Sequence, residues 1–206
     1  MTNFISHIII TIFLIASTSL SVNANDANSI LANASNNLVK SKSISANFSI
    51  INNGSPEQGS ITIAGDKFTI TTDELSTWFD GKTQWTYSSS INEVNISEPT
   101  PEELQFINPF AIIRNFKTEF NAKLLSNTNG VYKIILTPKN KNTSMKNIEL
   151  SLNSSSFFPT LVVINATNNI KTTIKVKSIK TGGTLPISTF TFNANNYPNI
   201  EIIDLR

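Results

Sequence analysis

Two adjacent pairs of carboxylates are the side chains of this sequence whose types and spacing could support catalysis. Asp73 lies next to Glu74, and Glu102 lies next to Glu103. A glycoside hydrolase needs two carboxylates that face each other across one cleft. Glu102 and Glu103 instead occupy the place of acids in the first turn of a helix, and the other pair falls in a turn or strand edge. A hydrolase of lipid or glycan that uses carboxylates alone is therefore kept only as an alternative.

Other catalytic side chains are scarce. The chain has no Cys, and its single His is His7, which lies in a segment that we expect to be removed. Without Cys and His the mature chain cannot carry out nucleophilic catalysis of the Ser-His or Cys-His type. It also cannot form a metal site built on His or Cys. Phosphate-binding and dinucleotide-binding motifs are also missing from the sequence. We therefore expect a binding protein with no cofactor and no metal, rather than an enzyme.

Residues 1–24 have the pattern of a cleaved signal peptide. Ile8 to Ile15 form a short apolar run, and Val22-Asn23-Ala24 supplies the small residues of a cleavage site. A membrane anchor would need about 20 apolar residues, and the serines that begin at Ser17 end the run sooner. We expect one mature domain, residues 25–206, located in a bacterial periplasm or, alternatively, in the medium.

The charge pattern gives no sign of nucleic-acid binding. The formal net charge is +2 and charged residues are 15% of the chain, whereas nucleic-acid-binding domains usually carry a basic stripe. A local basic row is formed by Lys171, Lys175, Lys177 and Lys180. The simplest interpretation of this row is the solvated face of a strand.

Most of the sequence predicts antiparallel strands. Ile30, Leu31, Ala34 and Leu38 have helical spacing and indicate one helix over 26–40. Thereafter apolar and polar residues alternate, with hairpin turns expected at Ala64-Gly65-Asp66, Asp80-Gly81 and Asn129-Gly130. From Leu75 onward, strands are expected at 75–79, 82–87, 120–125, 131–137, 145–152, 161–165, 170–179, 190–192 and 200–203.

A helical segment interrupts the strands. Thr100 can cap a helix that begins at Pro101, and Asn108-Pro109 starts a second one. Four large apolar residues recur at three-residue spacing: Leu104, Ile107, Phe110 and Ile113. Phe106, Ile112 and Phe116 lie beside them, so the two helices carry more apolar surface than one side needs. A curved sheet with one apolar face and a few short helices over it predicts an apolar cavity that holds apolar ligands.

Four segments of the chain resemble the LolA family of periplasmic lipoprotein carriers, in the form found in Bacteroidetes. They are TWFDGKTQWTY (77–87), NEVNISEPTPEEL (92–104), INPFAI (107–112) and YPNIEIIDLR (197–206). The resemblance implies an α+β, mainly β fold, an incomplete antiparallel β-barrel of about eleven strands with helices as a lid over an apolar cavity. The lid residues would be Leu104, Ile107, Phe110 and Ile113. The cavity wall would include Phe48, Ile50, Ile61, Ile63, Phe68, Trp78 and Trp85.

The resemblance also implies partners. A carrier of this family takes acylated lipoproteins from an inner-membrane ABC transporter and delivers them to the outer membrane or its receptor, and we expect it to act as a monomer. A carrier or sensor of another amphiphile, such as a glycolipid or a lipid-linked signal, is the alternative within the same fold.

One departure from the family concerns how the lid is held. Proteobacterial members have an Arg-Pro pair after the strand that matches residues 60–64, and that Arg hydrogen-bonds to the lid. Gly65 and Asp66 stand at the matching positions here. The neighbouring Lys67 has an ammonium group, which does not replace a planar guanidinium. The arginine latch of the proteobacterial members is therefore not carried over to this chain, and the sequence leaves open what holds the lid.

Overall fold

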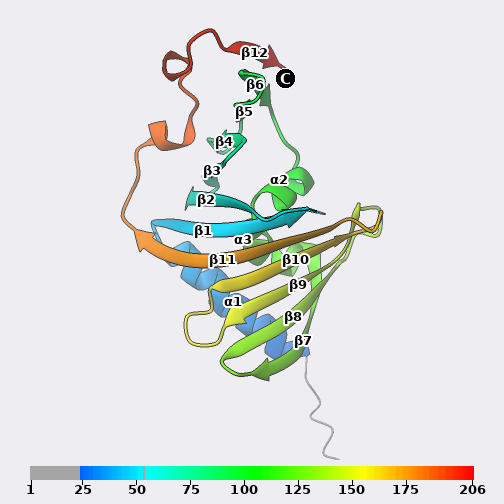
Figure 1. The fold of residues 1–206 in the computed structure, drawn as a ribbon. Helices are drawn as coiled ribbons and strands as arrows, with labels where there is room; N and C mark the ends of the chain where they lie inside the picture. The colour runs from blue at the N-terminus through cyan, green and yellow to red at the C-terminus, as the bar shows by residue number, and fades with distance from the viewer. Residues whose placement is uncertain (1–23, 53) are drawn as a thin grey trace, which may run out of the picture.

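A computed structural model describes residues 24–52 and 54–206 (Figure 1). The expected signal peptide, residues 1–24, lies almost wholly outside the described residues. The helices are α1 (Ala24–Lys40), α2 (Pro101–Ile107), α3 (Pro109–Arg114) and α4 (Phe116–Glu119), with two short 3₁₀ helices, η1 (Ile187–Phe190) and η2 (Ala194–Asn196). The strands are β1 (Ser43–Asn52), β2 (Glu57–Ala64), β3 (Lys67–Thr72), β4 (Leu75–Phe79), β5 (Gln84–Ser88), β6 (Glu93–Ser97), β7 (Phe120–Thr128), β8 (Val131–Pro138), β9 (Met145–Asn153), β10 (Pro159–Ala166), β11 (Lys171–Gly182) and β12 (Glu201–Asp204). No helix in the described ranges is long and apolar enough to cross a membrane.

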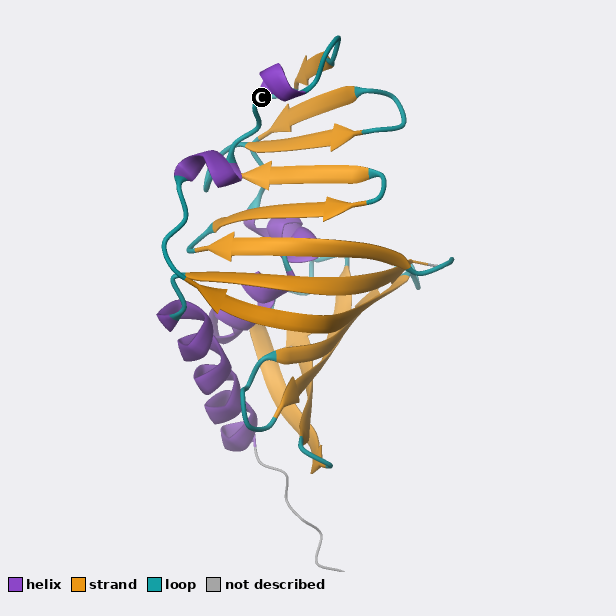
Figure 2. Cartoon of the chain, turned by 60° about the vertical axis from the view of Figure 1, so that its left-hand side comes forward, coloured by secondary structure: helices purple, strands orange, loops and turns teal. Residues whose placement is uncertain are grey.

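The strands form a single 12-stranded sheet in the order β12-β6-β5-β4-β3-β2-β1-β11-β10-β9-β8-β7. Neighbouring strands are antiparallel except β12, which runs parallel to β6. Figure 2 shows the part near β7 curling strongly beside α1, while the part near β12 continues as a ladder. In the described chain the two end strands do not pair with each other. The expected incomplete barrel with short helices is confirmed.

Two of the three expected hairpin turns differ from each other in structure. Asn129 and Gly130 both have positive φ, 53° and 73°, as a two-residue type I′ hairpin requires. In the other turn only Gly81 has positive φ, at 106°. The carboxylate of Asp80 accepts hydrogen bonds from the backbone N–H groups of Lys82 and Thr83, each at 2.9 Å. This side-chain turn makes the loop longer, so β5 begins at Gln84 rather than at Lys82.

The helices α2 and α3 begin where the sequence predicts. Thr100 and Glu103 form a reciprocal capping box, in which each side chain accepts a hydrogen bond from the backbone N–H of the other residue. Hydrogen bonds from Thr100 also hold the pKa of the Glu103 carboxyl below its ordinary value. The side chain of Asn108 accepts from the backbone N–H of Phe110 at 3.0 Å and caps α3. Two short caps in succession therefore hold these helices in place between β6 and β7.

The main core lies between the concave face of the sheet and the helices. α1 contacts β7 and α3, and α2 contacts α3. Fully buried side chains of this core come from strands and helices alike: Leu31, Phe68, Ile112, Ile113, Phe116, Ile134, Leu136, Ile148, Leu150 and Leu152.

The C-terminal tail covers the opposite face of β3 and β4. Phe190 is only 1% exposed, and the hydroxyl of Thr69 donates to the carbonyl oxygen of Thr189 at 2.6 Å. The expected strand over 190–192 is wrong, because Phe190 ends η1 and the tail packs its aromatic rings onto the sheet instead of pairing with it. Apolar side chains thus occur on both faces of this part of the sheet.

Candidate functional site: a divided apolar cavity

An apolar cavity of about 230 Å³ lies between the concave face of the sheet and helices α2 and α3, and we name it the main cavity for its apolar lining. Larger hollows elsewhere on the surface are lined by more polar residues. Strands β1, β2, β3 and β11 supply its wall, and Ile107 and Phe110 close it from the helical side. Asn52, Glu57 and Thr72 add polar groups to an otherwise apolar lining. The remaining lining residues are Ala46, Phe48, Ile50, Ile61, Ile70, Leu75, Ile174 and Val176.

Strand register explains why these side chains meet. Ala46 is paired with Ile61, and Ile61 with Ile70, and directly paired residues project from the same face of a sheet. Phe48 is paired with Gly59. A Cβ atom on Gly59 would lie 2.5 Å from Cζ of Phe48, so the missing side chain leaves room for that ring. The wall is therefore closely fitted at this point.

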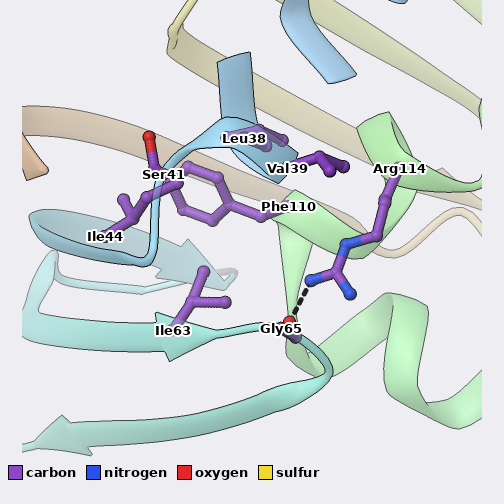
Figure 3. Close-up of a pocket in the computed structure, with 8 residues that line it drawn as sticks. All are labelled: Leu38, Val39, Ser41, Ile44, Ile63, Gly65, Phe110 and Arg114. Carbon is purple, nitrogen blue, oxygen red and sulfur yellow. Dashed lines mark hydrogen bonds between the residues drawn. The ribbon is translucent and has the colours of Figure 1, made fainter. Parts of the chain in front are cut away.

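A second cavity of about 180 Å³, the distal cavity, lies on the other side of Phe110 (Figure 3). Its lining residues are Leu38, Val39, Ser41, Ile44, Ile63, Gly65, Phe110 and Arg114. Figure 3 shows the ring of Phe110 extending from α3 toward Ile44. Phe110 is the residue that lines both the main and the distal cavity, and it is only 3% exposed.

Arg114 holds α3 to the turn between β2 and β3. Its guanidinium donates a hydrogen bond to the carbonyl oxygen of Gly65 (Figure 3). It donates a second one to the carboxylate of Asp66. The sequence shows that the arginine of the proteobacterial members is missing from Gly65 and Asp66, and it leaves open what holds the lid. The same turn is used, but here it supplies the acceptors and the helix supplies the arginine.

The expected lid residues occupy different surroundings. Ile107 and Phe110 line the main cavity. Leu104 lines a neighbouring cavity of about 210 Å³, together with Phe68 and other residues of β4 and α3. Ile113 is fully buried in the core and is not among the residues that line these three cavities.

The expected wall residues divide between the same cavities. Phe48, Ile50 and Ile61 line the main cavity, and Ile63 lines the distal one. Ala46, Ile70, Ile174 and Val176 line the main cavity as well, and our wall prediction missed them. The alternation of Ile174 and Val176 with Lys175 and Lys177, which are exposed, was the signal that could have identified two of them.

Trp78 and Trp85 do not lie on the cavity side, and their expected placement is corrected. They are paired with each other, and their face is opposite to that of Phe79, whose ring lies 5.2 Å from that of Phe68 in the core. Trp78 contacts aromatic rings of the tail, with centroids at 5.5 Å from Phe192 and 6.1 Å from Tyr197. Partial burial in this outer aromatic cluster raises the pKa of the Tyr197 hydroxyl, and the neighbouring Tyr87 adds to the effect. The second apolar face, rather than the cavity, accounts for these tryptophans.

The two carboxylate pairs lie in a solvent-exposed turn and at the start of α2. Asp73 and Glu74 lie in the turn between β3 and β4, exposed to solvent. Glu103 belongs to the capping box of α2, and Glu102 accepts a hydrogen bond from the hydroxyl of Thr143 at 2.6 Å. Among the described residues, no group of three or more His, Cys, Asp and Glu could hold a metal ion. The site offers apolar surface and a few polar groups, which suits binding.

Solved structures of low sequence identity have a similar fold. An uncharacterised conserved protein from Thermus thermophilus matches with a TM-score of 0.59 and 13% identity, covering 87% of this chain and 99% of that one. A domain assigned as an outer membrane lipoprotein-sorting protein, from Vibrio parahaemolyticus, matches with a TM-score of 0.51 and 12% identity, covering 85% and 99%. MucB matches with a TM-score of 0.50 and 13% identity, covering 87% and 66%. These likenesses show the fold alone.

Sequence comparison identifies the family. A comparison with curated proteins gives no match in sequence. Residues 17–168, which are most of the chain, match the family described as outer membrane lipoprotein carrier protein LolA. The fold of this family supports a binding or carrier role, in agreement with the divided apolar cavity. This chain therefore belongs to the LolA family of outer membrane lipoprotein carrier proteins.

Proposed function

We propose that this protein is a periplasmic carrier that holds the acyl chains of lipoproteins in its main cavity and moves them from the inner to the outer membrane. The observation that carries the proposal is the main cavity itself, walled by the apolar face of β1, β2, β3 and β11 and closed by Ile107 and Phe110. Family membership and a sheet open at one side agree with this role.

The energetics of the site favour a reversible carrier. Burying one methylene group contributes roughly 0.8 kcal/mol, so a hexadecanoyl chain gains on the order of 10 kcal/mol on leaving water. The ring of Phe110 covers the apolar wall and is only 3% exposed. A ligand must displace this ring, and the wall contacts that are lost offset part of the gain. Such competition keeps binding weak enough for the cargo to be released.

The remaining steps of the proposal concern its partners. Cargo would be received from an inner-membrane ABC transporter that releases lipoproteins, and delivered to the outer membrane or a receptor there. Delivery would need neither a cofactor nor a catalytic step in this chain. The signal peptide proposed for residues 1–24 would place the mature protein in the periplasm.

Native mass spectrometry of the protein purified from its own periplasm tests the cargo. Acylated protein in the complex supports the proposal, whereas a glycolipid or other amphiphile alone would show a carrier of a different cargo. Hydrolysis of a lipid or glycan panel that is lost in Asp73→Asn and Glu74→Gln would overturn the carrier role. Depletion of the protein should also leave lipoproteins in the inner membrane when the two membranes are separated.

A further inference from the structure

We propose that the main cavity and the distal cavity are two parts of one acyl-chain channel, with Phe110 as the gate between them. This inference rests on the proposed function, because it takes a saturated acyl chain as the ligand. It assigns the distal cavity as the site of the far end of that chain.

The strands make the two cavities continuous along one wall. On β1, Ile44 lines the distal cavity, and Ala46, the next residue on the same face, lines the main cavity. On β2 the same step separates Ile63 from Ile61, and the two pairs Ile44–Ile63 and Ala46–Ile61 are direct partners in the sheet. The backbone wall is thus unbroken, and a boundary between the cavities comes from the ring of Phe110 on the helical side.

Cavity size also favours one channel. Ligand cavities usually begin at about 300 Å³, and the main and distal cavities, at about 230 and 180 Å³, are each smaller than that. The summed volume of the two cavities exceeds this lower limit, even before the volume of the displaced Phe110 ring is added. From Ile44 to Asn52 the wall is roughly 26 Å long at about 3.3 Å per residue. That length exceeds the roughly 15 Å of one bilayer leaflet, which such a chain fills in a membrane.

The gate residue, Phe110, lies on the short helix α3, which is fixed at both of its ends. α3 has six residues; the Asn108 side chain caps its start, and Arg114 at its last position contacts Gly65 and Asp66. A displacement of α3 moves Phe110 directly. The far end of the channel reaches the surface beside Val39, which lines the distal cavity and is 69% exposed. A chain longer than the main cavity therefore has an apolar path once the ring moves.

Chain-length dependence tests the gate. The experiment measures the affinity of three methyl esters, with octanoyl, dodecanoyl and hexadecanoyl chains, by competition with an apolar fluorescent dye. Each ester is measured with the wild-type protein, with Phe110→Leu and with Phe110→Ala. Each methylene that gains apolar contact raises affinity by roughly fourfold. We expect the ratio of hexadecanoyl to octanoyl affinity to increase from wild type to Phe110→Leu to Phe110→Ala, by about tenfold or more across the series. Phe190→Ala is the matched control, because that ring is equally buried but lies on the opposite face of the sheet.

A second variant tests the distal site. Ile63→Phe adds bulk to the distal cavity and should reverse the gain of Phe110→Ala for the hexadecanoyl ester while leaving octanoyl binding unchanged. The same affinity ratio in the folded wild-type, Phe110→Leu and Phe110→Ala proteins would overturn the channel. Failure of every ester to bind the wild-type protein would instead overturn the proposed function, so the two failures are distinct.

Discussion

The guanidinium of Arg114, at the end of α3, contacts the carboxylate of Asp66 in the turn between β2 and β3. The same guanidinium donates to the carbonyl oxygen of Gly65. The Arg114 side chain is 24% exposed, whereas that of Asp66 is 83% exposed. The contact therefore joins a largely covered side chain at the end of α3 to a solvent-exposed turn, next to the ring of Phe110 that separates the two cavities.

Loss of this contact should loosen α3 without unfolding the sheet. An ion pair with a solvent-exposed partner contributes at most about 1 kcal/mol, so we expect Arg114→Ala to accelerate uptake and release of an apolar dye by roughly two- to fivefold with little change in the free energy of unfolding. Arg114→Lys should also fail to restore the wild-type rates, because an ammonium group lacks the planar fork that reaches two acceptors. Stopped-flow fluorescence measures these rates.

The control for Arg114→Ala is Arg206→Ala, which removes an exposed ion pair with Asp204 at 2.6 Å next to β12, at one edge of the sheet. Its dye exchange should equal that of the wild-type protein. Equal exchange rates in Arg114→Ala and wild type would show that the contact does not control the helix.

The sequence predicts the concave wall well because of simple alternation. Phe48, Ile50 and Ile61 recur at alternate positions among Asn, Ser and Thr, so one face of β1 and β2 is expected to be apolar. Capping residues likewise locate the starts of α2 and α3, since Thr100 and Asn108 satisfy backbone groups within the same short segment. Local chemistry was sufficient for these parts of the site.

The errors come from contacts that are distant in the sequence. On β4, Trp78 and Phe79 place large rings on both faces, so alternation cannot tell which face lines the cavity. The answer depends on the tail around Phe192, more than a hundred residues later. The Arg114 contact to Gly65 spans 49 residues and leaves no spacing signal. Long-range packing decided what the local pattern left open.

Substitution of Gly59 should narrow the main cavity. A Cβ atom at this position would lie 2.5 Å from Cζ of Phe48 and 3.0 Å from the carbonyl oxygen of Thr71. The ring is the more mobile neighbour, so Gly59→Ala should push it into the cavity and lower octanoyl ester affinity several-fold, at a cost of about 1–3 kcal/mol in the free energy of unfolding. Dye competition and urea unfolding measure the two effects.

Two comparisons make the Gly59 result specific. Gly183→Ala adds the same methyl group where no heavy atom lies within 4 Å, and it should change neither property. Adding Phe48→Leu to Gly59→Ala should restore ester affinity, because the smaller side chain vacates the space. Unchanged affinity in Gly59→Ala would mean that Phe48 yields in another direction.

Trp78 should matter for stability and not for ligand binding. Its ring packs against Phe192 and Tyr197 on the face away from the cavity, so Trp78→Ala should lower the free energy of unfolding by about 2–4 kcal/mol and leave dye affinity at the wild-type value. Phe48→Ala, on the cavity side, should lower both. A folded Trp78→Ala protein with much weaker dye binding would contradict the assignment of the two faces.

A carboxylate placed on the helices that close the main cavity should abolish dye binding. Ile107 is half-buried and Phe110 is buried, and both line this cavity. In Ile107→Glu the charge can reach water, so the sheet should stay folded, while dye affinity falls at least about tenfold because an apolar ligand would have to desolvate the carboxylate. Phe110→Glu should have the same effect on binding with a larger loss of stability, since its carboxylate replaces a ring that is 3% exposed.

Ile187→Glu, at a residue 56% exposed on the C-terminal tail, adds the same charge away from the cavity and should bind dye normally. Because Phe110→Ala is expected to improve binding of long chains, weak binding in Phe110→Glu would come from charge at the gate and not from loss of the ring. Normal dye binding in both folded Ile107→Glu and Phe110→Glu would count against these helices as the cover of the ligand site.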